Sequence, residues 1–196
     1  QNMNTEHIKY GYFWVPGNEF EEFVLSWKEK AELIEPDAIY LHHPVHATLF
    51  LFYGERKKES DYLSHISSVP PKFTAVRWLV FENDTVTGGD TLTIGLGKTL
   101  AWESFQLNLA ESMKPFIEQA IEYPNSWDGS FKKSYQDYGF PFVGKHWMPH
   151  VSIASLKNKS FIHEVIHTPI KINEINCGEL ALYRIEGETH TRIYAN

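Results

Sequence analysis

The chain has 196 residues, of which 42% are hydrophobic and 15% aromatic, and this is enough apolar material for one compact domain with a substantial core. Its 18 Lys and Arg against 25 Asp and Glu give a formal net charge of −7, which argues against a protein that binds duplex DNA through attraction to its phosphates. The apolar runs are shorter than the roughly 20 residues that a membrane-spanning helix needs. No linker rich in Pro, Gly or Ser divides the chain, so we expect one domain over residues 1–196.

The single cysteine, Cys177, has no partner for an internal disulfide, which favours an intracellular protein. Residues 1–5 lack the charged, apolar and small-residue regions of a secretory signal. We therefore expect a cytoplasmic monomer that binds no membrane.

In the first half of the chain, segments with the sequence pattern of a β-strand alternate with a segment that has the pattern of an amphipathic helix. Residues 8–15 are aromatic and β-prone and predict a strand. Asn18, with Glu21 three residues later, resembles a capping box, and apolar residues at three-and-four spacing continue the predicted helix up to Pro36. A β-prone stretch over 38–53 follows, and Pro44 predicts a bend or bulge inside it.

Later segments continue this alternation. A short helix is predicted within 61–69, strands at 73–82 and 91–96, and an amphipathic helix over 102–121 with a kink at Pro115. Residues 125–144 show no clean period and predict a long loop with at most one helical turn. Four β-like runs end the chain, at 150–156, 168–176, 179–185 and 189–194. The order of elements predicts an α+β or mixed α/β architecture.

Histidine followed two residues later by Thr or Ser occurs three times among the ten histidines of the chain. The triplets are His46-Ala47-Thr48, His65-Ile66-Ser67 and His150-Val151-Ser152. The first and third lie in apolar, alternating segments, where the imidazole and the hydroxyl of each project from one strand face about 7 Å apart. The triplet at His65 lies in a helical or turn context, and we discount it.

Two such units, 104 residues apart in the chain (150 − 46), suit chemistry on a phosphodiester. One neutral ring can take a proton from water or from a ribose hydroxyl while the other, protonated, gives one to the leaving oxygen. The hydroxyls of Thr48 and Ser152 can donate to the non-bridging phosphate oxygens. This chemistry needs no metal or other cofactor.

The paired motifs on apolar strands resemble those of the two-histidine (2H) phosphoesterase superfamily. The resemblance extends over most of the chain and implies an α+β, bilobal fold with pseudo-two-fold symmetry, in which antiparallel sheets flanked by helices surround a central cleft. It implies that His46 and His150 are the acid–base pair and that Thr48 and Ser152 hold the phosphate. The implied substrates are a 2′,3′-cyclic phosphate, a 2′,5′-linked oligonucleotide or a cyclic (oligo)nucleotide, which would be hydrolysed or cyclised. The segment before the first motif and the long loop before the second depart from the family pattern and leave the substrate open.

Further residues are candidates for substrate binding, although each also has a structural interpretation. Tyr12 could stack on a base from the first strand, where most aromatic side chains belong to the core. Phe142 and Trp147 precede the second motif, where they could stack on a base or cover the sheet. Lys145 could contact phosphate or lie on the solvated surface.

Three alternatives stay open. The histidines at 42, 43 and 46 could bind a metal, although zinc usually takes three or four convergent ligands and no cysteine or carboxylate accompanies them nearby. The chain could be a nucleotide-binding module without turnover. It could also be an aromatic-rich interaction domain in which the motifs are fortuitous.

Overall fold

The computed structural model describes residues 7–117, 129–172, 175 and 178–195. Within them, seven strands form one antiparallel sheet in the order β3-β4-β5-β2-β1-β6-β7. The strands are β1 (His7–Pro16), β2 (Ala47–Glu55), β3 (Val76–Phe81), β4 (Asp90–Leu96), β5 (His150–Leu156), β6 (Gly178–Glu186) and β7 (Thr189–Ile193). The α-helices are α1 (Asn18–Ile34), α2 (Glu59–Ser64), α3 (Leu100–Met113), α4 (Gly129–Tyr138) and α5 (Lys159–Val165). Short 3₁₀ helices are η1 (Arg56–Lys58), η2 (Lys114–Phe116) and η3 (Gly144–His146).

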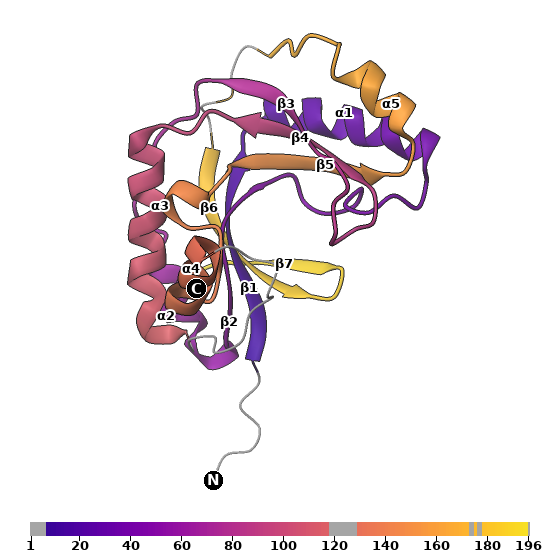
Figure 1. The fold of residues 1–196 in the computed structure, drawn as a ribbon. Helices are drawn as coiled ribbons and strands as arrows, with labels where there is room; N and C mark the ends of the chain where they lie inside the picture. Colours follow the sequence, from indigo (N-terminus) through magenta and orange to yellow (C-terminus); the bar gives the residue numbers. More distant parts are fainter. Residues whose placement is uncertain (1–6, 118–128, 173–174, 176–177, 196) are drawn as a thin grey trace.

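The sheet consists of two halves that meet at its centre. Strands β3, β4 and β5 form one half, and β2, β1, β6 and β7 form the other. The pairing between β5 and β2 is short and is centred on Ala47 opposite Val151. Helix α1 packs against β5 and α3 against β2, and Figure 1 shows α1 and α5 beside the first half and α3 beside the second.

The core lies on one face of this sheet. A row of paired residues crosses six strands on that face and consists of Trp78, Ile94, Val151, Ala47, Trp14 and Leu180. Trp14 is fully buried, and its ring contacts Phe20 from α1 and Phe73 from the segment before β3. Phe73 in turn stacks on Trp102 of α3, with ring centroids 4.1 Å apart. Both major helices therefore bury their apolar sides on the same face, and the two His motifs lie on the other, which we call the motif face.

The α+β class and most predicted elements are confirmed. Strands β1, β4, β5, β6 and β7 match their predicted segments within two residues, and so does α1. The predicted capping box at Asn18 is wrong, because Gly17 is the N-cap residue and no side chain caps the helix. The Gly17 carbonyl oxygen accepts the first hydrogen bond of the helix, from the Glu21 N–H at 3.0 Å. The two halves belong to one continuous sheet instead of separate sheets.

Other predicted segments differ from the structure. The stretch over 38–53 forms a strand only from Ala47, because turns occupy residues 40–42 and Tyr40 has a positive φ of 80°. Residues 129–138 form α4 where a loop was predicted, and the predicted loop residues 125–128 lie outside the described residues. The helix predicted over 102–121 ends at Met113 and continues as η2 around Pro115, and its residues beyond Ile117 are also outside the described part.

Two further differences from the predicted elements lie in the C-terminal half of the chain. Helix α5 was not predicted, and it begins after Asn158, whose side chain accepts from the Phe161 N–H at 3.0 Å. The β-like run over 168–176 is not a strand in its described residues, 168–172 and 175. No helix in the described residues is long and apolar enough to cross a membrane.

Candidate active site

The two motifs lie directly opposite each other across the centre of the sheet. Ala47 of the first motif pairs with Val151 of the second, and both side chains are fully buried on the core face. Counting one residue in each direction along these antiparallel strands sets His46 opposite Ser152 and Thr48 opposite His150. All four side chains are half-buried and project from the motif face. The sequence pattern thus brings together an imidazole and a hydroxyl from each half of the sheet.

A β-bulge follows the hydroxyl residue of each motif, at equivalent positions in the two strands. Strand β1 pairs Phe13 with Thr48 and then Tyr12 with Phe50, so Leu49 is the extra residue. Strand β4 pairs Thr93 with Ser152 and then Leu92 with Ala154, so the extra residue there is Ile153. A bulge bends its strand and increases the local twist, and bulges are frequent beside active sites. The equivalent bulges support the pseudo-two-fold relation between the halves.

The two imidazole rings are oriented in the same way. His46 Nδ1 bonds to the Pro44 carbonyl oxygen at 2.5 Å, and His150 Nδ1 bonds to the Met148 carbonyl oxygen at 2.6 Å. Because a carbonyl oxygen can only accept, Nδ1 carries the hydrogen in both rings, and the neutral ring holds its lone pair on Nε2. Within the described part of the chain, neither Nε2 has a hydrogen-bond partner, and neither do the hydroxyls of Thr48 and Ser152.

The surroundings lower the pKa of both histidines. Burial lowers the pKa of His46 to about 3, and the nearby His190, Lys28 and His43 lower it further while the bond to Pro44 opposes the shift. Burial also lowers the pKa of His150, but there the carboxylate of Asp84 acts in the opposite direction. Both rings are therefore neutral at pH 7 in the free protein, and His46 is held in that state by burial and by the positive charge of Lys28.

Aromatic side chains flank both rings. Phe13 is 1% exposed and stacks on His46, with ring centroids 3.7 Å apart and an interplanar angle of 23°. Phe81 contacts His150 edge-on, with centroids 4.9 Å apart. The two contacts come from β1 and β3, so each half of the sheet supplies its own aromatic support. Sequence periodicity could not find these contacts, because they depend on strand pairing.

The predicted substrate-binding residues have different surroundings. Tyr12 is fully buried on the core face, where its hydroxyl donates to the Tyr62 carbonyl oxygen at 2.8 Å, so its predicted contact with a base is wrong. Trp147 is 2% exposed, and its indole N–H donates to the Thr48 carbonyl oxygen at 2.9 Å. It therefore supports the first motif from behind and is buried away from substrate. Phe142 is 47% exposed and lies against Phe131 and Phe140.

Lys145 is exposed in η3. Within the described residues, no ring contact, ion pair or hydrogen bond joins Phe142 or Lys145 to the motif residues, so their contact with substrate stays a prediction. A buried residue that sequence analysis missed, Gln106, links this segment to the first motif. Its side chain donates to the Leu49 carbonyl oxygen at 2.9 Å and accepts from the Gly144 N–H at 2.8 Å.

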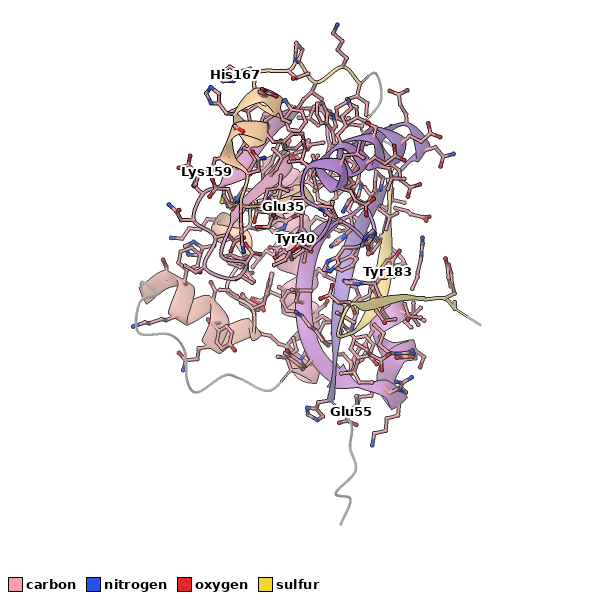
Figure 2. The ribbon with its side chains drawn as sticks, turned by 90° about the vertical axis from the view of Figure 1, so that its right-hand side faces the viewer. Glu35, Tyr40, Glu55, Lys159, His167 and Tyr183 are labelled. Atoms are coloured by element: carbon pink, nitrogen blue, oxygen red, sulfur yellow. The ribbon has the colours of Figure 1, made fainter. Side chains whose placement is uncertain are left out.

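The segment before His46 is held by a buried lysine. Lys28 of α1 is 4% exposed, and its ammonium group donates to the Tyr40 carbonyl oxygen at 2.6 Å. Tyr40, labelled in Figure 2, has a positive φ, and its neighbour Ile39 forms an isolated bridge with Ser155 of β5. These contacts fix the backbone that leads to Pro44, whose carbonyl orients His46.

The histidines that were candidates for a metal site contact different side chains and do not converge on one point. His42 contacts Glu32 at 3.3 Å, and His43 contacts Glu188 at 2.8 Å. Among the described residues, no three His, Cys, Asp or Glu side chains gather in an arrangement that could hold a metal ion. His43 also lies beside His190 of β7, with ring centroids 4.4 Å apart.

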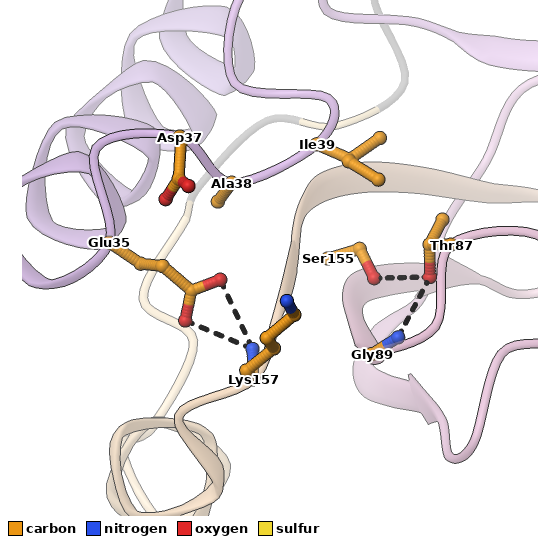
Figure 3. A pocket seen from close by; sticks show the side chains of 8 residues that line it. All are labelled: Glu35, Asp37, Ala38, Ile39, Thr87, Gly89, Ser155 and Lys157. Atoms are coloured by element: carbon orange, nitrogen blue, oxygen red, sulfur yellow. Dashed lines mark hydrogen bonds between the residues drawn. The ribbon is translucent and has the colours of Figure 1, made fainter.

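A pocket of about 340 Å³ lies away from the four motif side chains, at the far end of β5. Figure 3 shows Glu35 and Asp37 on one side of it and Thr87 and Ser155 on the other. The Glu35 carboxylate accepts from the Lys157 backbone N–H at 2.9 and 3.1 Å, and the Thr87 and Ser155 hydroxyls bond to each other at 2.6 Å. Because its polar groups largely satisfy one another, we do not place the chemistry there.

No protein-family model and no curated protein matches the sequence, but solved structures share the fold. E. coli LigT complexed with NADP⁺ is 11% identical, with a TM-score of 0.52 over 96% of each chain. E. coli LigT complexed with 3′-AMP is 14% identical, with a TM-score of 0.51 over 96% of this chain and 97% of the other. A structure described as a phosphoesterase is 10% identical, with a TM-score of 0.50 and the same coverage. The chain thus has the fold of the two-histidine phosphoesterases, as the motifs predicted.

Proposed function

We propose that this chain is a metal-independent phosphodiesterase that hydrolyses or cyclises an RNA-like phosphodiester, with His46 and His150 as its acid–base pair. The observation that carries the proposal is the Ala47–Val151 pairing, which brings a His and a hydroxyl residue from each half of the sheet to one place. The shared fold supports the same reaction class.

In the proposed reaction, one imidazole accepts a proton at Nε2 from water or from a ribose hydroxyl as the oxygen attacks phosphorus. The bond from phosphorus to the leaving oxygen breaks, and the other ring, protonated, gives its Nε2 proton to that oxygen. The Lys28 ammonium group near His46 favours that ring as the base, and the Asp84 carboxylate near His150 favours that ring as the acid. The Nδ1 bonds to the backbone keep both Nε2 atoms directed away from their own strands.

The two hydroxyls have a separate role in this proposal. Thr48 and Ser152 donate to the non-bridging oxygens of the phosphate and stabilise the charge that develops there. Their side chains lie diagonally across the strand pair, each opposite the histidine of the other motif. A phosphate between the strands would thus meet both hydroxyls and both rings.

A nucleotide is the substrate class we propose, because LigT is complexed with NADP⁺ and with 3′-AMP in the similar structures. The net charge of −7 favours a small nucleotide over a long RNA. A 2′,3′-cyclic phosphate, a 2′,5′-linked oligonucleotide and a cyclic (oligo)nucleotide all contain a phosphodiester that fits this chemistry.

One observation favours a second function, a nucleotide-binding module without turnover. The pKa values of both histidines are lowered, and a neutral imidazole cannot act as the acid. Turnover therefore requires that the negative charge of the bound phosphodiester raise the pKa of one ring. A binding module predicts thermal protection by nucleotides with no product on ion-exchange chromatography.

A substrate panel in the presence of EDTA tests the proposal. The panel contains 2′,3′-cyclic mononucleotides, 2′,5′- and 3′,5′-dinucleotides and cyclic dinucleotides, and the products are separated by the hydroxyl that retains the phosphate. We expect turnover of at least one phosphodiester, abolished in His46→Ala and His150→Ala. Turnover that needs added zinc, or that survives both substitutions, would contradict the proposal.

A further inference from the structure

A row of three paired residues leads from the second motif to the edge of the sheet. His150 of β5 pairs with Gly95 of β4, and Gly95 pairs with Arg77 of β3. Directly paired residues of antiparallel strands project from the same face. Arg77 and His150 are therefore on the motif face, with a glycine between them.

Gly95 leaves room for the arginine side chain above β4. A Cβ built on Gly95 would lie 3.3 Å from Arg77 Cζ and 3.4 Å from Arg77 Cγ. The guanidinium group thus lies over the glycine and leans across β4, toward β5 and away from the edge of the sheet. A Cβ at position 95 would also lie 3.2 Å from Leu79 Cβ, so any larger residue there would crowd both neighbours.

Arg77 also differs from the other arginines in its charge partners. The chain has four arginines, and Arg184, Arg192 and Arg56 pair with Glu59, Glu179 and Glu186. Within the described residues, Arg77 has neither an ion pair nor a hydrogen bond from its side chain, and it is exposed. An unpaired guanidinium beside a candidate active site is a suitable phosphate ligand, because its planar donors match phosphate oxygens.

We infer that Arg77 binds a second phosphate of the substrate, on the His150 side of the phosphate held by the motifs. This inference rests on the proposed function of the same site. Neighbouring strands are about 4.8 Å apart, so a guanidinium above β4 lies one strand beyond His150 and two beyond β2. That position is displaced sideways from the space shared by the two motifs and suits a phosphate on the adjoining nucleotide.

The inference narrows the substrate class. A substrate with a phosphate on each side of one nucleoside engages both the motifs and Arg77, whereas a cyclic mononucleotide engages the motifs alone. We therefore infer that the substrate is an oligonucleotide, or a nucleotide with a further terminal phosphate.

Binding measurements test this inference without relying on turnover. Isothermal titration calorimetry at low salt compares adenosine 3′,5′-bisphosphate with adenosine 3′-monophosphate. We expect the second phosphate to tighten binding to the wild type about 10-fold, the effect of one charge-assisted contact. Arg77→Met should abolish this gain and Arg77→Lys should retain part of it, because lysine keeps the charge but loses the planar donors.

Two further variants separate position from charge. Gly95→Ala keeps Arg77 but places a methyl group 3.3 Å from the guanidinium carbon, so the arginine must shift and the gain from the second phosphate should fall. Arg56→Met removes a different exposed arginine, which pairs with Glu186, and should leave the gain unchanged. The inference is overturned if the wild type shows no gain, or if Arg77→Met retains the full gain. If the second phosphate tightens binding about 10-fold through Arg77 but the protein turns over no substrate, the inference about Arg77 stands and the proposed enzymatic function is wrong.

Discussion

The Trp147 indole N–H donates to the carbonyl oxygen of Thr48, and this bond ties the segment before the second motif to the strand of the first. Trp147→Phe keeps most of the buried ring but leaves that carbonyl without its donor. An unsatisfied buried acceptor costs about 1–3 kcal/mol, so we expect a loss of stability of this size in urea denaturation. We also expect lower turnover, because the strand position of Thr48 is no longer fixed. Unchanged stability would show that the bond contributes nothing.

Removing either motif hydroxyl should affect the reaction and leave the fold intact. Neither Thr48 nor Ser152 has a side-chain hydrogen bond among the described residues, so Thr48→Val and Ser152→Ala remove only the proposed phosphate contacts. We expect kcat to fall by about 10²- to 10³-fold in each, as for a lost oxyanion donor, with urea midpoints close to wild type.

A matched control for these variants is Ser67→Ala, in the third, discounted motif. Ser67 is exposed after α2, and its hydroxyl bonds to the Ser64 carbonyl oxygen at 3.2 Å. Its activity should equal that of the wild type. A loss equal to that of Ser152→Ala would contradict the assignment of the site.

The lowered pKa of His46 predicts a dependence of stability on pH. The folded ring titrates at about 3, whereas the unfolded ring titrates near 6.5, so the unfolded state binds more protons between these values. The contribution of His46 to the free energy of unfolding is therefore fully present above pH 6.5. It is lost as the pH falls from 6.5 toward 3, by up to about 1.4 kcal/mol per pH unit.

Urea denaturation at pH 7, 6 and 5, with His46→Asn alongside, measures this contribution. Asparagine does not titrate, so the variant should lose less stability than the wild type over this range, although carboxylates affect both proteins equally. Parallel curves for the two proteins would show that the pKa of His46 is not lowered.

Buried Lys28 predicts a second effect, at alkaline pH. Burial lowers its pKa to about 8, below the ordinary value near 10.5. The unfolded chain binds more protons between these values, so this group makes the folded state more stable as the pH rises from 8 to 10.5. Lys28→Met should lack this rise in urea denaturation at pH 7.5, 8.5 and 9.5.

The same substitution tests what the lysine does for the site. Loss of the bond from Lys28 to the Tyr40 carbonyl oxygen should loosen the segment that carries Pro44, so we expect kcat to fall while the protein stays folded. Full activity in Lys28→Met would show that His46 is oriented without it.

Sequence periodicity predicted most strands and both motifs, because the side chains of a half-buried strand alternate between its two faces. This alternation is visible in the sequence of one strand, even when the strands that pair with it are unknown. It could not predict that Ala47 pairs with Val151, which is a property of register between distant segments. For the same reason it missed Arg77, whose relation to His150 passes through Gly95 on an intervening strand. It assigned Tyr12 to the substrate although the strand turns that side chain into the core. The β-prone stretch before His46 was overestimated, because Lys28 and the positive φ of Tyr40 hold it in turns.

The most direct measurement of the central claim is a double-mutant cycle on His46 and His150, with turnover of the best phosphodiester followed in EDTA. Two rings that act on one phosphate as acid and base form a unit, so either single alanine variant should lose about 10²- to 10⁴-fold, and the double variant should lose little more. Losses that multiply in the double variant, or a single variant within a few-fold of wild type, would show that the two histidines do not act on one phosphate.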